Sequence, residues 1–289
     1  MINQTIDNAM AGPFGQKYTP HPVVPSLQHV SSSPISYLIT EELEKLLSKL
    51  SLRPNLEYLM NREILLLLDS ISLPPLIKIH DIHATIAFSQ AYENEKGYSI
   101  ATGLLISRLI KKAHHDGVDQ FVLDFEGIKP IDYLCYFLES KRDNSLEIYI
   151  KGEVGEYCAS NASGGRYILE KTGLRLGNSA HHSTFFAQEV GDACCNWTRN
   201  VKLYSFKAGK YCATQSRQGR FYIQDAGTKW GIHSKKCFFY TPSEQMFNHS
   251  PESNDNTKIR LLPRERWEKI FRPAQQAFAK LDSYCGGTP

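Results

Sequence analysis

The sequence predicts a mixed fold, in which a small α/β domain is followed by a parallel β-helix of 18-residue coils and a C-terminal helix. Three observations lead to this fold class. Apolar residues recur at helical and strand spacing in residues 37–145, and again at helical spacing in residues 263–289. Between these segments, glycines recur every 18 residues, at 155, 173, 191, 209 and 227. A fixed period of this kind is typical of stacked structural units.

Composition and charge narrow the classes of function. The 289 residues include 33 basic and 30 acidic side chains, so the formal charge is only +3. Nucleic acids and anionic membranes need clustered Lys and Arg, so neither is expected as a partner. No apolar stretch reaches the roughly 18 residues of a spanning helix, and the first residues lack a signal-peptide pattern. The seven cysteines follow no CxxC spacing, which favours reduced thiols in a soluble, cytoplasmic protein.

The N-terminal part is expected to begin with an extended arm over residues 1–36. Prolines at 13, 20, 22, 25 and 34 would interrupt any helix there. A first helix is expected from Thr40, an N-cap residue, to Leu50. Its apolar stripe consists of Leu43, Leu46, Leu47 and Leu50. A second helix is expected over about residues 55–70.

In the rest of the α/β domain, which spans residues 37–145, apolar residues alternate between helical and strand spacing. The pattern predicts strands at 76–79 and 84–88, a helix from Ser99 that stops at Gly117, a strand at 121–125, and a short helical turn at 133–138. A β-helix domain is then expected at 146–245, with its repeat clearest over 148–240. A linker at 246–262 and a helix at 263–289 complete the chain.

Columns of like residues accompany the glycines of the repeat. Three positions after each glycine stand Cys158, Leu176, Cys194, Cys212 and Trp230. Because stacked coils place such positions above one another, these cysteines are expected to be packed as small buried apolar residues. The glycine column is expected to mark a corner where the backbone needs positive φ or a close approach to its neighbour.

Two adjacent apolar columns predict a covered outer stripe. One column holds Tyr149, Tyr167, Phe185, Leu203, Phe221 and Phe239, and the next holds Ile150, Ile168, Phe186, Tyr204, Tyr222 and Tyr240. Neighbouring strand residues point to opposite faces, so only one column can line the interior. The other forms an apolar ladder outside, which the helix at 263–289 is expected to cover. The alternative is that this helix caps the open end of the stack.

The repeat resembles a known family. The segment Gly152–Ala159, followed by residues 163–168, is similar to the GXGXG repeat domain of the glutamate synthase large subunit and of formylmethanofuran dehydrogenase. This resemblance implies a right-handed β-helix with a structural, non-catalytic role. The chain departs from the family because Ala159, Cys195 and Ala213 replace the second glycine, and because the large synthase domains are absent.

Four residues are the candidates for chemistry. His80 and His83 flank Asp81, and two imidazoles with one carboxylate could meet a metal, although polar residues of a β-turn explain the pattern more simply. Asp124 and Glu126 follow a strand at its carboxyl end, where α/β proteins often hold their sites, although turns commonly carry such residues.

Other histidine pairs favour structural roles. His114 and His115 suit the C-terminal end of a helix dipole, and His181 and His182 are expected at a solvated corner of a coil.

The preferred hypothesis is a non-catalytic scaffold or protein-interaction protein, with a protein partner or a second copy of the chain bound to it. No cofactor and no metal are expected, and catalytic residues are not identified. The alternative is an enzyme or ligand-binding regulatory protein with its site in residues 76–132, built from His80, His83, Asp124 and Glu126.

Overall fold

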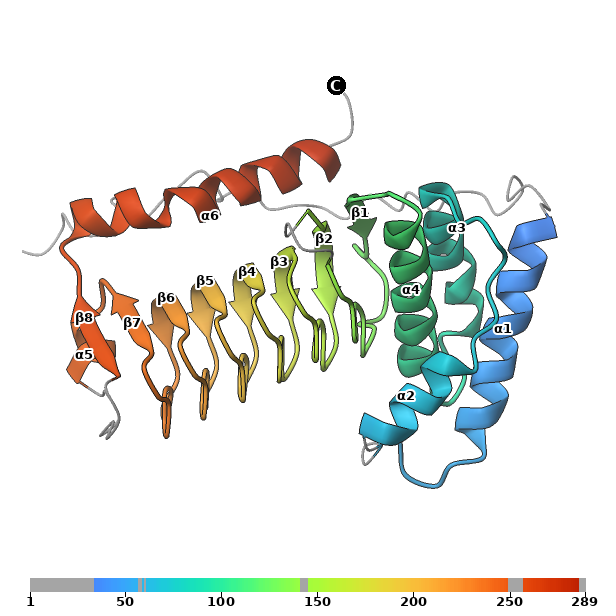
Figure 1. The fold of residues 1–289 in the computed structure, drawn as a ribbon, viewed down its shortest axis with the longest axis horizontal. Coiled ribbons are helices and arrows are strands. Elements are labelled where there is room, and N and C mark those ends of the chain that lie inside the picture. The colour runs from blue at the N-terminus through green and yellow to red at the C-terminus, as the bar shows by residue number, and fades with distance from the viewer. Residues whose placement is uncertain (1–33, 57–58, 60, 141–144, 249–256, 286–289) are drawn as a thin grey trace, which may run out of the picture. The chain divides into compact units, whose positions relative to one another are not determined.

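The structure is a computed structural model that describes residues 34–56, 59, 61–140, 145–248 and 257–285. The chain divides into two compact units, Met1–Ser32 and Ser33–Pro289. The first unit lies outside the described residues, and so does most of the arm predicted at 1–36. The following description concerns the second unit, whose helices precede a stack of strands (Figure 1).

Four helices form the N-terminal part of this unit: α1 (Pro34–Ser51), α2 (Asn61–Asp69), α3 (Ile79–Ser89) and α4 (Tyr98–His115), with a 3-10 turn η3 (Gln90–Tyr92) after α3. The leucine stripe predicted on the first helix is buried. That helix begins at Pro34, earlier than the predicted Thr40, because proline is tolerated in the first turn, where the amide has no helical partner. Gly117, with φ of 106°, follows the end of α4 as predicted.

The predicted strand at 84–88 was wrong, because these residues lie within α3, and residues 76–78 belong to no strand. The carboxylate of Asp81 accepts a hydrogen bond from the Lys78 amide at 2.8 Å, which closes a capping box at the start of α3. Ile82 and Ile86, four residues apart, are both buried. This helical spacing outweighs the strand propensity of the apolar run.

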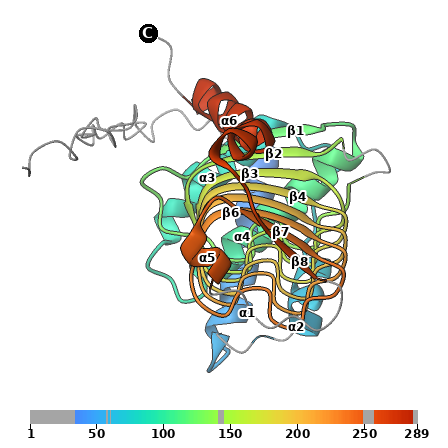
Figure 2. The same ribbon diagram turned by 90° about the vertical axis from the view of Figure 1, so that its left-hand side faces the viewer.

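The strands form one eight-stranded parallel sheet in sequence order, as successive rungs of a β-helix (Figures 1 and 2). They are β1 (Gln120–Asp124), β2 (Glu147–Val154), β3 (Arg166–Thr172), β4 (Thr184–Val190), β5 (Lys202–Ala208), β6 (Arg220–Ala226), β7 (Phe238–Thr241) and β8 (Lys258–Leu261). The 18-residue period is confirmed from β3 to β7. The segment predicted as a linker contains β8 and most of a short helix, α5 (Glu244–Asn248).

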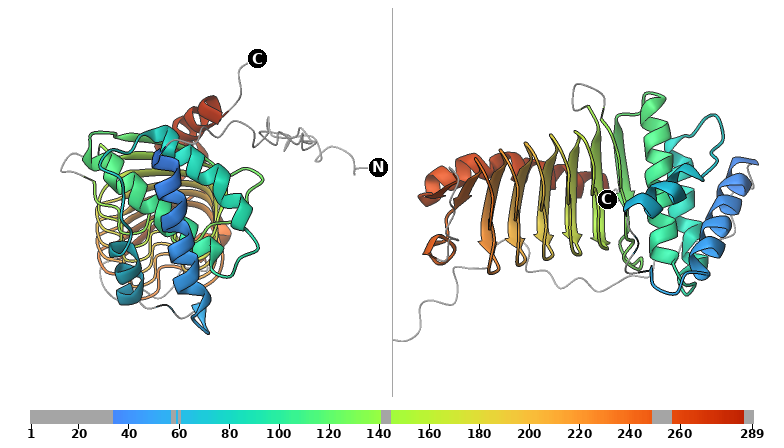
Figure 3. Two further views of the ribbon diagram at one scale, coloured as in Figure 1. Left: turned by 90° about the vertical axis from the view of Figure 1, so that its right-hand side faces the viewer. Right: turned by 60° about the horizontal axis from the view of Figure 1, so that its bottom comes forward.

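The β-helix begins one coil earlier than predicted. Strand β1 pairs with β2, and the partner of Phe121 is Ile148, 27 residues later. The helical turn predicted at 133–138 is instead the corner of this first coil, formed by residues 132–137, and the Tyr133 amide donates to the Glu156 carbonyl at 2.8 Å. Helix α4 packs on this corner: a Cβ added to Gly103 would lie 1.8 Å from the Asp132 carbonyl oxygen. The helices therefore cover one end of the stack (Figure 3).

The glycine column marks a close approach between coils and not a positive φ. None of these five glycines lies in the left-handed region. A Cβ added to Gly191 would lie 2.5 Å from the Gly173 carbonyl oxygen, and one added to Gly209 would lie 2.7 Å from the Gly191 carbonyl carbon. Stacked coils thus touch backbone to backbone at this column, where no side chain fits.

Positive φ occurs instead in the corner that follows each glycine. Tyr157, Ala159 and Asn161 have φ of 58°, 50° and 56°, and the later coils repeat this alternation. The Tyr157 and Asn161 amides donate to the next coil at 2.9 and 2.8 Å, and the Ala159 amide donates to the preceding coil at 2.7 Å. These bonds between coils offset the cost of a left-handed backbone, which is about 1 kcal/mol or more for each non-glycine residue.

The interior of the coils is closely packed. The cysteine column, which consists of Cys158, Cys194 and Cys212, is buried and forms no disulfide. A bulge between Ile150 and Glu153 shifts the pairing of β2 with β3 by one residue, so Tyr149 pairs with Ile168 and not with Tyr167. The inner column is therefore Phe121, Ile148, Tyr167, Phe185, Leu203, Phe221 and Phe239.

The outer column forms an apolar ladder that helix α6 (Arg264–Cys285) covers, as predicted (Figure 2). Tyr149, Ile168, Phe186 and Tyr222 are buried in one cluster with Trp267, Phe271, Ala274, Ala277, Phe278 and Leu281 of the helix. The ring centroids of Tyr204 and Tyr222 lie 4.5 Å apart, and those of Phe206 and Phe271 lie 5.0 Å apart. Among the described helices, none combines the length and the apolar character that crossing a bilayer requires.

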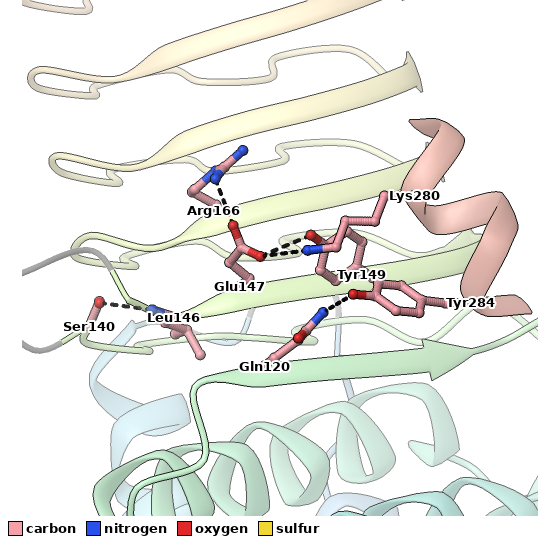
Figure 4. A network of polar contacts seen from close by, with 8 residues as sticks. All are labelled: Gln120, Ser140, Leu146, Glu147, Tyr149, Arg166, Lys280 and Tyr284. Atoms are coloured by element: carbon pink, nitrogen blue, oxygen red, sulfur yellow. Dashed lines mark hydrogen bonds and ion pairs between the residues drawn. The ribbon is translucent and has the colours of Figure 1, made fainter. Parts of the chain in front are cut away.

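Polar contacts fix the C-terminal end of α6 to the first strands (Figure 4). Glu147 accepts from Arg166 at 2.6 Å, from the Tyr149 hydroxyl at 2.9 Å and from Lys280 at 3.4 Å. The Lys280 ammonium lies 5.0 Å from the centre of the Tyr149 ring, and hydrogen bonding to Tyr149 raises the pKa of Lys280. The Gln120 amide donates to the Tyr284 hydroxyl at 2.5 Å.

Candidate functional site

The two histidines predicted as possible ligands lie on α3 and point to separate contacts. His80 is largely exposed, and its Nε2 lies 3.4 Å from Asp81 Oδ1. The Nε2 of His83 is 2.8 Å from the Val122 carbonyl, which joins α3 to β1. Asp81 itself is buried as the cap of its helix. These three residues thus support the start of α3 and its contact with the first coil.

The two carboxylates predicted for acid/base work lie at the end of β1, as expected, and both are exposed. Asp124 Oδ1 accepts a hydrogen bond from the Glu126 amide at 2.9 Å, and the Glu126 carboxylate forms an ion pair with Lys151. In the described part of the chain, no hydrogen bond or ion pair joins either carboxylate to His80 or His83. Nor do three or more His, Cys, Asp or Glu side chains converge there as a group that could hold a metal.

The other histidine pairs and the cysteines have structural surroundings. His114 is buried at the end of α4, where Nδ1 lies 3.1 Å from the Val118 carbonyl and 3.0 Å from Asp119. Burial raises the pKa of the Cys158 thiol, and a hydrogen bond to Cys194 together with burial raises that of Cys212. A high thiol pKa leaves little thiolate, so the cysteine column is poorly suited to nucleophilic or redox chemistry.

A different surface of the β-helix concentrates charge of one sign. We call it the basic face, and it consists of the five equivalent segments 160–166, 178–184, 196–202, 214–220 and 232–238. These segments contain no Asp or Glu, and they contain seven Lys or Arg: Arg166, Arg199, Lys202, Arg217, Arg220, Lys235 and Lys236. The rest of the chain keeps 26 basic residues against all 30 acidic ones, so its net charge is negative.

One column of this face forms a ladder of basic side chains. His181, Arg199, Arg217 and Lys235 pair with one another in succession as parallel β-bridges. We call these four residues the basic ladder. Stacked coils are about 4.8 Å apart, so the ladder is roughly 14 Å long. All four residues are exposed, and in the described chain neither Arg199 nor Arg217 forms an ion pair with an acidic residue.

A shallow groove runs along the ladder. It has a volume of about 470 Å³ and is lined by the basic ladder together with Trp197, Thr198, Gln215 and His233. The Trp197 side chain is 62% exposed, whereas Trp230 and Trp267 are buried at 1% and 6%. Among the described residues, the buried Gln215 Oε1 has no hydrogen-bond partner. The groove therefore offers several cations and one aromatic surface.

The electrostatics of the groove already favour an anion. Partial burial, then His182 and Arg199, lower the pKa of His181, because its protonated form would be desolvated and repelled by nearby positive charge. An anion in the groove would reverse the repulsion. His181 is therefore neutral at pH 7 in the free protein, and it can gain a proton when negative charge is bound.

Sequence reasoning placed His181 and His182 at a solvated corner but missed the basic face, so its expectation of no nucleic-acid partner took no account of this cluster of basic residues. The small total charge concealed it, because acidic residues elsewhere balance the ladder. Counting charges column by column in the 18-residue repeat would have found it, since Arg199, Arg217 and Lys235 are equivalent positions.

Comparison of the chain with protein-family models, with curated proteins and with solved structures found no match.

Proposed function

We propose that this protein is a non-catalytic scaffold whose β-helix binds an anionic partner on its basic face. The observation that carries this proposal is the acid-free set of five stacked segments with seven Lys or Arg. A protein partner, or a second copy of the chain, would have to bring acidic residues to this face. Among the described residues, no hydrogen bond or ion pair joins the two histidine candidates to the two carboxylate candidates, which supports the scaffold over the enzymatic alternative.

A purely structural role would not explain the ladder. Two like charges about 4.8 Å apart repel by roughly 1 kcal/mol in water, and by more beside a protein surface. Elsewhere on the β-helix, equivalent positions pair opposite charges, as Lys171 with Glu153 and Lys207 with Glu189, both at 2.8 Å. On the basic face Arg166 pairs with Glu147 of the preceding coil at 2.6 Å, whereas among the described residues neither Arg199 nor Arg217 has such a pair. A bound anion would relieve the repulsion between these two arginines.

Two finer features belong to the same proposal. We infer that the coils are related to the GXGXG repeat domain, supported by the 18-residue spacing and the glycine column. That relation would make the β-helix right-handed and its role structural. We also place the protein in the cytoplasm, supported by its six free, buried cysteines among the described residues.

Binding to a panel of polyanions tests the proposed function. Labelled polyglutamate, a sulfated polysaccharide and a single-stranded oligonucleotide are titrated with the protein at low salt. At least one should bind, and the Arg199→Glu/Arg217→Glu variant should lose that binding. The control is Lys269→Glu/Arg272→Glu, which changes the net charge equally on exposed positions of α6. Failure of all three polyanions to bind, or an equal loss in both variants, would refute the proposal.

A further inference from the structure

We infer that the groove on the basic face binds single-stranded nucleic acid, with a base stacked on Trp197. This inference rests on the proposed function, because it names the anionic partner of the same face. Proteins that bind single strands combine a positively charged groove along the backbone with aromatic side chains on which bases stack. Both elements are present here within one groove.

Trp197 is the residue that distinguishes this ligand from other polyanions. It has φ of 59° in a corner position, and the residue is 62% exposed beside the ladder. Equivalent positions in the neighbouring coils are Ser179, Gln215 and His233. Polyglutamate or a sulfated polysaccharide would use the cations but has no flat aromatic group to place on an indole. A nucleobase has such a face, and it would bury apolar surface that is now in water.

The polar groups of the groove suit the rest of a nucleotide. Guanidinium groups donate paired hydrogen bonds to phosphate oxygens, and Arg199 and Arg217 stand one coil apart for this purpose. The Gln215 side chain, one coil from Trp197, lines the same groove and adds an uncharged carboxamide for a base edge. The ladder continues to His181 at one end, which can gain a proton when an anion is bound, and to Lys235 at the other.

A single strand fits this surface better than a duplex. A base must be unstacked to lie on Trp197, and a single strand gives up little to present one. The ladder is straight and roughly 14 Å long, which accommodates only a few phosphates of one strand. The number of strong phosphate contacts is therefore expected to be small, about two to four.

The experiment titrates the whole chain with fluorescein-labelled oligo(dT) and oligo(rU) of twelve nucleotides and follows anisotropy and tryptophan emission. Trp197 is the only exposed tryptophan of the three, so stacking of a base should quench its emission specifically. Trp197→Ala should weaken binding by about 5- to 150-fold, the range of a base stacked on an aromatic ring. Trp197→Phe should restore part of that affinity.

Salt dependence separates phosphate contacts from general attraction. Each phosphate contact of a single strand contributes about 0.7 to the slope of log affinity against log salt. Arg199→Gln/Arg217→Gln should therefore reduce the slope by about 1.4, whereas Lys269→Gln/Arg272→Gln should leave it unchanged. Circular dichroism of each variant verifies that the β-helix is folded.

Three outcomes decide the matter. Oligonucleotide binding that quenches Trp197 and depends on the two arginines supports the inference. Binding of polyglutamate or the sulfated polysaccharide with equal affinity and no dependence on Trp197 overturns it, while the proposed anionic partner stands. Absence of binding to every polyanion overturns both.

Discussion

Replacing Phe271 with alanine tests how much the contact between α6 and the outer apolar ladder contributes to stability. Phe271 is 1% exposed, and its ring lies 4.7 Å from Trp267, 5.0 Å from Phe206 and 6.1 Å from Tyr204. A buried phenylalanine replaced with alanine costs about 3–5 kcal/mol, from lost burial and the cavity that remains. In a domain of this size each kcal/mol lowers Tm by about 2–4 °C, which predicts a decrease of roughly 6–20 °C.

The assay is thermal unfolding followed by circular dichroism and by tryptophan emission. Trp267 belongs to α6 and is buried against the outer column, so a helix that detaches before the coils unfold should shift its emission to longer wavelength. Arg272→Ala is the control, since the neighbouring side chain is exposed on the same helix. A Phe271→Ala protein that melts within 1 °C of the parent, with unchanged Trp267 emission, would refute the reasoning.

The remaining predictions concern thiols, charge and metal. The cysteine column should resist thiol reagents in the native protein, and Cys→Ala there should cost about 1–3 kcal/mol through lost packing; rapid native labelling of all three would contradict this. Burial raises the pKa of Glu170, so ionisation of this carboxyl opposes folding. Glu170→Gln should therefore raise Tm at pH 7. The gain in Tm should disappear in acid, below the pKa of the unfolded carboxyl, about 4.3. The Glu170 carboxylate accepts a hydrogen bond from the Gly152 amide at 2.8 Å. A lower Tm of the variant at pH 7 would show that this bond to the ionised carboxylate stabilises the fold more than burial of the charge destabilises it. Elemental analysis of protein purified without added metal should find no tightly bound ion, and stoichiometric zinc lost in His80→Ala/His83→Ala would restore the enzymatic alternative.

The sequence predicted the regular part of the β-helix well, because stacking repeats its constraints at every coil. Gly191 and Gly209 recur since backbone contact leaves no room for Cβ, and this signal survives in a single sequence. The first coil was missed because a bulge lies between Ile150 and Glu153 and the strands of that coil are 27 residues apart, which breaks the period. Helix α3 was wrongly predicted as a strand because an apolar run as short as residues 84–88 fits a strand as well as it fits part of a helix.

The candidate site was less predictable, because a site depends on which side chains the fold brings together. His80 and Asp124 were candidates because histidine and aspartate can bind metals or transfer protons, yet each makes a local contact that sequence cannot reveal. The basic ladder shows the opposite case. Arg199 and Arg217 are unremarkable one at a time, and only the stacking of coils makes them neighbours.

Helix α6 also matches the β-helix in length. Its 22 residues span about 33 Å at 1.5 Å each, and the seven intervals between eight strands span about 34 Å. Its C-terminal end is fixed by Tyr284 on Gln120, a contact across 164 residues of sequence. A duplicated coil would lengthen the stack by about 4.8 Å, or three helical residues, and would move one end of α6 off its partners. Repeat proteins commonly gain and lose units during evolution, whereas this chain can change its number of coils only if α6 changes in step.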